Sequence, residues 1–248
     1  MLSSISSVQS ISKFGFNDVK LSNYLELRYD FSTSGTTVLD ISGKKRHGTV
    51  YGDATFITPL TNFPNATLQK TNTYCYSLPY SAGGYNNNHR ITLSGPFPIQ
   101  TKNYSISFWM RPITNSGNNL MYVYEILADK VFLMEGYNNL KTYGVNCTPS
   151  VYGLFPYEIA LNVNTWAHIV VTFDYNTLST TSYVNGLSKI VQPLDSTYFF
   201  PTLNFPSLSI GRKLNNYSWT FSGVIADFRI YSKVLTADDA LSLYNGIN

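Results

Sequence analysis

The feature that most constrains this chain is a series of short runs in which apolar and polar residues alternate, separated by clusters of Gly, Asn, Pro and Ser. The runs begin at Glu26 and are rich in Val, Ile, Thr, Tyr and Phe, which is typical of β-strands. In the run at 105–112, Ile106, Phe108 and Met110 share one face, which we expect to face a core. The pattern therefore predicts an all-β protein.

Two of the runs predict more than a single strand. The run at 165–174 carries apolar residues on both faces, as expected of a central strand covered on both sides within a layered sandwich. In the run at 182–191, Asn185-Gly186 separates two alternating halves. Because Asn and Gly tolerate positive φ best, this pair predicts a hairpin with a type I′ turn.

A short helix is predicted after the last strand. Thr236 is followed three residues later by Asp239, which is the spacing of a capping box. We expect the helix to run from Ala237 to about Tyr244, with Gly246 available for the left-handed conformation that ends it.

The balance of charges excludes some classes of partner. The chain has 17 Lys plus Arg against 14 Asp plus Glu, a formal charge of +3, and only 12% of its residues are charged. Binding to a nucleic-acid backbone needs clustered Lys and Arg, so we expect no nucleic-acid partner. No stretch approaches about 18 uninterrupted apolar residues, so we expect no membrane insertion.

The length of 248 residues is compatible with one domain, since all-β sandwiches often reach roughly 250 residues as a single unit. We expect a loosely held arm at 1–22 and one domain at 23–248. The first residues lack the charged start and the apolar run of about 7 to 15 residues of a secretory signal. Whether Cys75 and Cys147 form a disulfide or stay free thiols remains open.

Seven phrases stand in one order from about Glu26 to Asn245. They resemble the concanavalin A-like lectin/glucanase superfamily, in particular its laminin G-like, pentraxin-related domains. The resemblance implies a jelly roll of two antiparallel sheets, which binds ligand, and often calcium, at its rim or on its concave face. The phrases are YDF (29–31), VLDISGKKRHGTV (38–50), YSISFWMRP (104–112), NTWAHIVVTFD (164–174), SYVNGL (182–187), LSIGR (208–212) and FSGVIADFRIYSKVLTADD (221–239).

The resemblance is incomplete at the acidic positions. Family members often carry paired acids before the last strand, whereas here Ala226 precedes Asp227. Asp40, in a tight turn, can offer oxygen ligands to calcium, and the family fold implies that Asp227 lies near it. We therefore predict calcium at Asp40 and Asp227. The alternative is that Asp40 caps its own turn and Asp227 pairs with Arg229 or Lys233.

We expect no catalysis. Glu125 and Asp129 lie on one face of a strand about 13 Å apart, whereas glycosidases hold their two carboxylates roughly 5 to 9.5 Å apart. The three His residues, His47, His89 and His168, have no spacing suited to metal binding.

Aromatic and amide residues favour carbohydrate binding instead. Aromatics make up 15% of the chain, with 20 Tyr and 15 Phe. Sugars need aromatic faces for their apolar side and amides or carboxylates for their hydroxyls. Trp109, on the non-core face of its strand, can meet ligand or can pack under a loop. The predicted ligand residues are Trp109, Tyr85, Tyr137, Tyr143, Tyr152, Trp219 and Asn138, with Asn86, Asn87, Asn88 and Asn139 as further amides.

The sequence thus predicts a non-catalytic, lectin-like recognition or adhesion domain that is displayed on a virion or extracellular surface and binds a glycan or glycoprotein. The alternative is a structural component of a virion shell or fibre that contacts other virion proteins, or copies of itself, and binds no sugar. A virion protein assembled inside a host cell needs no secretory signal, which fits both readings.

Overall fold

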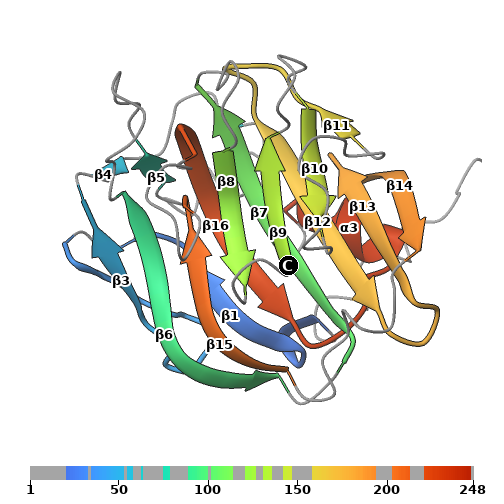
Figure 1. The fold of residues 1–248 in the computed structure, drawn as a ribbon, viewed down its shortest axis with the longest axis horizontal. Helices are drawn as coiled ribbons and strands as arrows, with labels where there is room; N and C mark the ends of the chain where they lie inside the picture. The colour runs from blue at the N-terminus through green and yellow to red at the C-terminus, as the bar shows by residue number, and fades with distance from the viewer. Residues whose placement is uncertain are drawn as a thin grey trace, which may run out of the picture.

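The structure is a computed structural model that describes residues 21–32, 35–52, 55–57, 63, 75–78, 89–99, 102–113, 121–126, 131–135, 142–146, 158–193, 203–212 and 221–246. Only the main chain is described at 75–78, 94–99, 121–122, 131–135, 142–146, 158–160, 188–190, 192–193 and 203–206. The described residues form two antiparallel sheets and, near the C-terminus, helix α3 (Ala237–Tyr244), so the all-β prediction is confirmed (Figure 1).

Each sheet has eight described strands, and in Figure 1 sheet B lies in front of sheet A. Sheet A has the order β14 (Leu187–Pro193), β13 (Ser179–Val184), β12 (Ala167–Asp174), β7 (Tyr104–Pro112), β16 (Gly223–Tyr231), β5 (Cys75–Leu78) and β4 (Thr55–Ile57), with β1 (Leu25–Tyr29) also paired to β16. Sheet B has the order β11 (Glu158–Ala160), β10 (Thr142–Asn146), β9 (Val131–Glu135), β8 (Met121–Ile126), β15 (Leu203–Ile210), β6 (Arg90–Ile99), β3 (Gly48–Tyr51) and β2 (Thr37–Val38).

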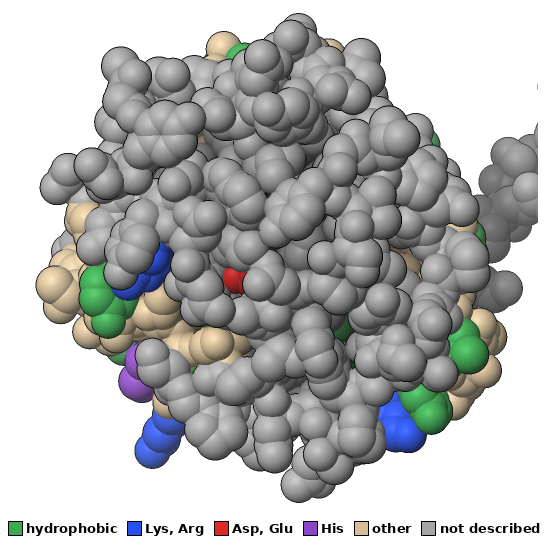
Figure 2. Space-filling view, viewed as in Figure 1, with side chains coloured by type: hydrophobic (Ala, Val, Ile, Leu, Met, Phe, Trp, Pro, Cys, Tyr) green, Lys and Arg blue, Asp and Glu red, His purple; other side chains and the backbone are tan. Residues whose placement is uncertain are grey.

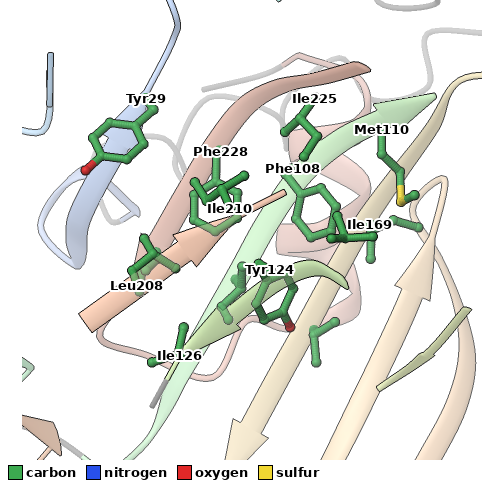
Figure 3. Close-up of a cluster of buried hydrophobic side chains, with 14 of the residues drawn as sticks. Tyr29, Phe108, Met110, Tyr124, Ile126, Ile169, Leu208, Ile210, Ile225 and Phe228 are labelled. Atoms are coloured by element: carbon green, nitrogen blue, oxygen red, sulfur yellow. The ribbon is translucent and has the colours of Figure 1, made fainter. Parts of the chain in front are cut away.

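The main core lies between the two sheets (Figure 3). Phe108 of β7 stacks on Phe228 of β16 at 5.6 Å between ring centroids and meets Tyr124 of β8 edge-on at 5.7 Å. Ile106 and Met110 lie on the same side of β7 as Phe108, as the alternation predicted. Complete burial of such a side chain stabilises the fold by roughly 1.5 to 3 kcal/mol.

A second apolar layer covers the outer face of sheet A. Ala240 and Leu243 of α3 pack against Val170 and Tyr183, and in Figure 1 the helix lies behind β12 and β13. β12 is therefore buried on both faces, as predicted for the run at 165–174. Leu21, the first described residue, joins this layer with 4% exposure, so the folded unit includes at least one residue of the arm predicted at 1–22, whose residues 1–20 lie outside the described ranges.

Both local predictions near the C-terminal end of the chain are confirmed. Asn185 and Gly186 have φ of 52° and 77° and join β13 to β14. The hydroxyl of Thr236 accepts the N–H of Asp239, and the Asp239 carboxylate accepts the N–H of Thr236. In the described part of the chain, no helix has the length and apolar character needed to cross a membrane.

Candidate functional site

Four strands of sheet A begin or finish at the same end of the sheet. In the antiparallel pairing, Tyr104 at the start of β7 lies opposite Phe173 near the end of β12. Tyr231, the last residue of β16, lies opposite both Ser105 of β7 and Leu25, the first residue of β1. The segments that enter or leave these four strands are therefore brought together in space, although up to about two hundred residues of sequence separate them.

These segments enclose an open pocket of about 320 Å³, which we call the end pocket. This volume is at the small end of the roughly 300 to 1,000 Å³ of typical small-molecule sites. Such sites are mostly apolar, whereas Val234 is the only aliphatic side chain among the described residues of this lining. The lining consists of Tyr24, Asn103, Asp174, Asn176, Ser232, Lys233 and Val234.

The wall formed by the β12–β13 turn is fixed by hydrogen bonds. Asn103 Oδ1 accepts the N–H of Tyr175 at 2.8 Å, and Asp174 Oδ1 accepts the N–H of Asn176 at 2.9 Å. The ammonium group of Lys102 lies 3.8 Å from the centroid of the Tyr175 ring, which adds a cation–π contact. The turn is thus held in one conformation before any ligand arrives.

Polar groups of the turn remain available to a ligand. Asp174 is half-buried, and its Oδ2 accepts no hydrogen bond within the described part of the chain. The side-chain amide of Asn176 is exposed and makes no hydrogen bond with any described residue. Across the pocket, the Tyr24 side chain is 42% exposed. The end pocket therefore offers an acceptor, an amide and an aromatic ring to solvent.

Lys233, by contrast, is engaged by the protein. Its Nζ lies 2.9 Å from Asp239 Oδ2 and 5.6 Å from the centroid of the Tyr24 ring. Burial by itself would raise the pKa of Asp239, but the bonds from the Thr236 N–H and the Lys233 ammonium hold that pKa below 3.8. The carboxylate stays ionised at neutral pH, so the charge of Lys233 is balanced and the pocket is tied to the cap of α3.

The predicted calcium residue Asp40 satisfies its carboxylate with nearby N–H groups. Oδ1 accepts the N–H groups of Arg28 at 3.0 Å and Ser42 at 2.9 Å, and Oδ2 accepts the N–H of Arg46 at 2.9 Å. The Ser42 hydroxyl also donates to Oδ2 at 2.9 Å. This arrangement matches the alternative in which Asp40 caps its own turn.

Asp227, the second predicted calcium residue, lies in a bulge of β16 and has a φ of 47°. Its carboxylate accepts from Arg28 Nε at 3.0 Å and from Arg229 through Nε at 2.9 Å and through Nη2. Burial favours the neutral acid, but the two guanidinium groups hold the pKa of Asp227 below 3.8. Arg28 contacts both predicted carboxylates, so the expectation that they lie near each other agrees with the structure.

These two carboxylates do not fit a calcium shell. Calcium takes six to eight oxygen ligands, whereas the oxygens here already face N–H donors, and two guanidinium cations adjoin Asp227. No group of three or more His, Cys, Asp or Glu side chains that could hold a metal occurs among the described residues. The donors around both carboxylates argue against calcium, and calcium at Asp40 and Asp227 stays an untested prediction from the sequence.

Trp109 has only 1% of its surface exposed. Its ring lies 4.9 Å from Phe63, 5.6 Å from Tyr244 of α3 and 5.0 Å from His168, measured between centroids. It is on the non-core face of β7, as predicted, but Phe63 and Tyr244 of α3 pack on that face. The indole offers no open face to a sugar, and the packing alternative describes its place.

His168 is wholly buried beside Trp109. Its Nε2 lies 3.0 Å from the hydroxyl of Ser107, which is also buried. Burial first, and then the charge of Arg229, lower the pKa of His168 from 6.5 to about 3, against an opposing effect of Asp227. This Ser–His pair cannot meet a substrate, because both side chains lie within the packed layer.

The remaining predicted ligand residues are not tested. Tyr143 lies in β10, of which only the main chain is described. The others, and Cys147, lie outside the described residues: Tyr85, Asn86, Asn87, Asn88, Tyr137, Asn138, Asn139, Tyr152 and Trp219. Figure 2 shows the described Lys and Arg side chains of one face at separate places on its rim rather than in one basic patch.

The sequence reasoning missed the end pocket. A signal existed, because Asn103 stands two residues before the predicted strand at 105–112 and Asp174 ends the predicted central strand at 165–174, with Asn176 two residues later. Polar residues that flank neighbouring central strands can meet at one end of the sheet, in the loops that join the strands. Their pairing with Tyr24 needed the order of strands in space.

A laminin G-type family model, described as the concanavalin A-like lectin/glucanases superfamily, matches residues 84–240. The match covers more than half of the chain, and the chain belongs to this family. None of the curated proteins matches its sequence.

Solved structures share the fold at low sequence identity. They include the binding domain of botulinum neurotoxin DC in complex with rat synaptotagmin II, at 15% identity and a TM-score of 0.64 over 92% of this chain and 52% of that one. A second structure comes from work on botulinum neurotoxin type C, whose cell entry depends on interaction with two ganglioside molecules. It matches at 15% identity and a TM-score of 0.64, over 93% of this chain and 53% of that one. The binding domain of Paraclostridial Mosquitocidal Protein 1 matches at 14% identity and a TM-score of 0.63, over 91% of this chain and 53% of that one.

The expected jelly roll of two antiparallel sheets with a short C-terminal helix is thereby confirmed. The chain spans about half the length of each of these three structures. Likeness at this level of identity concerns the fold, and the synaptotagmin and ganglioside partners belong to the neurotoxins.

Proposed function

We propose that this chain is a non-catalytic recognition domain that binds carbohydrate at the end pocket. The observation that carries the proposal is that Asp174 Oδ2 and the Asn176 amide, which have no hydrogen-bond partner among the described residues, line one pocket with the exposed Tyr24. A sugar presents hydroxyls on one side and C–H groups on another, so it needs hydrogen-bonding groups and an aromatic surface together.

The related proteins support binding as the general role. The family description names lectins beside glucanases, and the neurotoxin structures contain rat synaptotagmin II in one case and concern gangliosides in another. A glycan or a glycoprotein is therefore the class of partner that we propose for this chain. Display on a virion or an extracellular surface belongs to the same proposal, since a recognition domain acts where its partner is exposed.

The carboxylates at the pocket support binding without turnover. Glycosidases need two carboxyl groups that flank the scissile bond. Asp174 is the only acidic residue in the described lining, and the nearby Asp239 is engaged by Lys233 and by the cap of α3. A single carboxylate can accept hydroxyl hydrogen bonds, but it does not supply the second carboxyl group that such hydrolysis needs.

A glycan array tests the proposal. The full chain should bind a set of glycans saturably, and the same glycans should be recovered intact after long incubation. Absence of saturable binding, or release of cleaved sugar, would refute it. A parallel thermal melt with millimolar calcium tests the predicted ion, because a ligand that binds only the folded state raises the melting temperature.

A second candidate function, a structural component of a virion shell or fibre, is favoured by the edge of sheet A. β14 is the last of the described strands on that side, and its Leu187 and Val191 are 61% and 62% exposed. An edge strand with exposed apolar side chains is suited to pairing with another chain, including a second copy. Light scattering after size exclusion should then give a mass above that of the monomer, and Val191→Lys should reduce it.

A further inference from the structure

We infer that the end pocket selects a neutral sugar with two adjacent free hydroxyls over an acidic sugar. The inference rests on the proposed function and adds the class of ligand. It is carried by Asp174 and Asn176 on one wall, Tyr24 on the other, and the balanced charge of Lys233.

The first step concerns the hydroxyls. Asp174 uses Oδ1 to accept the N–H of Asn176, which orients the carboxylate and leaves Oδ2 as an acceptor that has no partner among the described residues. The side chain of Asn176 brings both an amide donor and a carbonyl acceptor to the same turn. Two adjacent hydroxyls can donate to the carboxylate and accept from the amide, and hydrogen bonds to a charged group are stronger than neutral ones.

The second step concerns the apolar side of the sugar. Tyr24 is 42% exposed and enters the lining from the segment before β1, whereas the turn follows β12, and Val234 contributes the aliphatic part of the described lining. The ring can contact the C–H groups of a pyranose while its hydroxyl remains in water. The lining is too polar for a lipid tail or an extended apolar peptide side chain, because burying its polar groups without hydrogen bonds is costly.

The third step concerns charge. Lys233 lies 2.9 Å from Asp239, so its charge is already balanced. Lys102 stands outside the lining and contacts the ring of Tyr175. Asp174 therefore sets the sign of the field in the pocket, and a carboxylate or sulfate on the ligand would approach a like charge. A neutral sugar avoids this repulsion.

Saturation-transfer NMR on the full chain tests the inference. The neutral probes are the methyl glycosides of glucose, galactose and mannose, and the acidic probe is the methyl glycoside of N-acetylneuraminic acid, each with and without EDTA. The variants are Asp174→Asn, Asn176→Ala and Tyr24→Ala. Asp238→Asn is the matched control, since it makes the same change at an exposed residue of α3 outside the pocket.

We expect at least one neutral glycoside to bind, with at least tenfold weaker binding in Asp174→Asn and Asn176→Ala and no change in Asp238→Asn or with EDTA. Binding of the acidic probe alone would overturn the inference and leave the proposed function standing. Neutral binding that survives both turn variants would overturn the assignment of these residues. If neither probe class binds, on the array or in solution, both proposals fail.

Discussion

Two clusters of polar residues on sheet A are built from similar groups and are used differently. In the buried ion cluster of Arg28, Asp227 and Arg229, each carboxylate oxygen of Asp227 meets a guanidinium, and Asp227 and Arg229 are 4% and 5% exposed. In the end pocket, Asp174 is half-buried and one of its oxygens has no partner among the described residues. Side-chain type alone does not separate a structural carboxylate from one that can bind ligand.

The difference lies in where each cluster stands along its strands. The ion cluster is placed within β1 and β16, where neighbouring strands and the layer that contains α3 exclude water. A buried charge needs partners in the protein, so the cluster satisfies itself. The end pocket lies beyond the strand ends, where water can solvate a free carboxylate until a ligand replaces it. The predictions that follow test this contrast.

The largest effect is expected for Asp227→Ala. It removes the carboxylate that pairs with the buried guanidinium of Arg229, and the loss of one partner of a buried ion pair costs about 3 to 5 kcal/mol of unfolding free energy. The positive φ of 47° adds roughly 1 kcal/mol, because Ala tolerates this region less well than Asp. Urea unfolding measures the loss. Asp227→Asn keeps the shape and removes the charge, so its unfolding free energy should lie between those of Asp227→Ala and the wild type. A loss below about 1 kcal/mol in Asp227→Ala would contradict the buried-pair description.

Trp109→Ala should destabilise the fold by about 3 to 5 kcal/mol, since truncation of a buried aromatic opens a cavity among Phe63, His168 and Tyr244. Trp109→Phe keeps most of the packing and should lose less. If Trp109 instead contacted ligand at the surface, the Ala variant would unfold like the wild type and lose glycan binding, and this result would reverse its assignment.

The stability of the wild type should fall as the pH is lowered from 6.5 to 4.5. His168 has a pKa of about 3 in the folded chain and 6.5 when unfolded, so in this window only the unfolded chain takes up its proton. The slope is half of about 1.4 kcal/mol per pH unit at pH 6.5 and approaches the full value at lower pH, which gives about 2 kcal/mol over the window. Asp227 stays ionised here, because its folded pKa lies below 3.8.

His168→Gln removes this titration and keeps a donor and an acceptor near Ser107. Between pH 6.5 and 4.5, we expect its unfolding free energy to fall less than that of the wild type, and the difference should equal the contribution of His168. This holds whatever the absolute stability of the variant. Urea unfolding of both proteins at pH 4.5 and 6.5 gives the comparison. Equal slopes would show that His168 is not held neutral by burial.

The smallest effect on stability is expected for Asp174→Asn. Its Oδ1 can still accept the N–H of Asn176 as an amide oxygen, and the side chain has no buried ion partner, so the unfolding free energy should change by less than about 0.5 kcal/mol. A pronounced loss of stability would place Asp174 with the buried cluster. Thermal melts beside Asp227→Asn, the same substitution in the other cluster, make the contrast direct.

The strand pattern, the Asn185-Gly186 turn and the capped helix were all predicted from the sequence. Each is a local property: alternation fixes which side of β7 is apolar, Asn and Gly permit positive φ, and Thr236 reaches an N–H three residues away. Local geometry is determined by residues close in sequence, so the sequence carries it directly.

The roles of the polar and aromatic residues were decided by the tertiary structure. Trp109 stands on the face of β7 that the sequence indicated, yet only the position of α3 and Phe63 shows that this face is closed. Asp227 and Asp174 both occur at or near the end of an apolar run, and burial beside two Arg residues or exposure at a sheet edge separates them. Solvent access and charge partners depend on segments far apart in the chain, which is why only the fold could assign these residues.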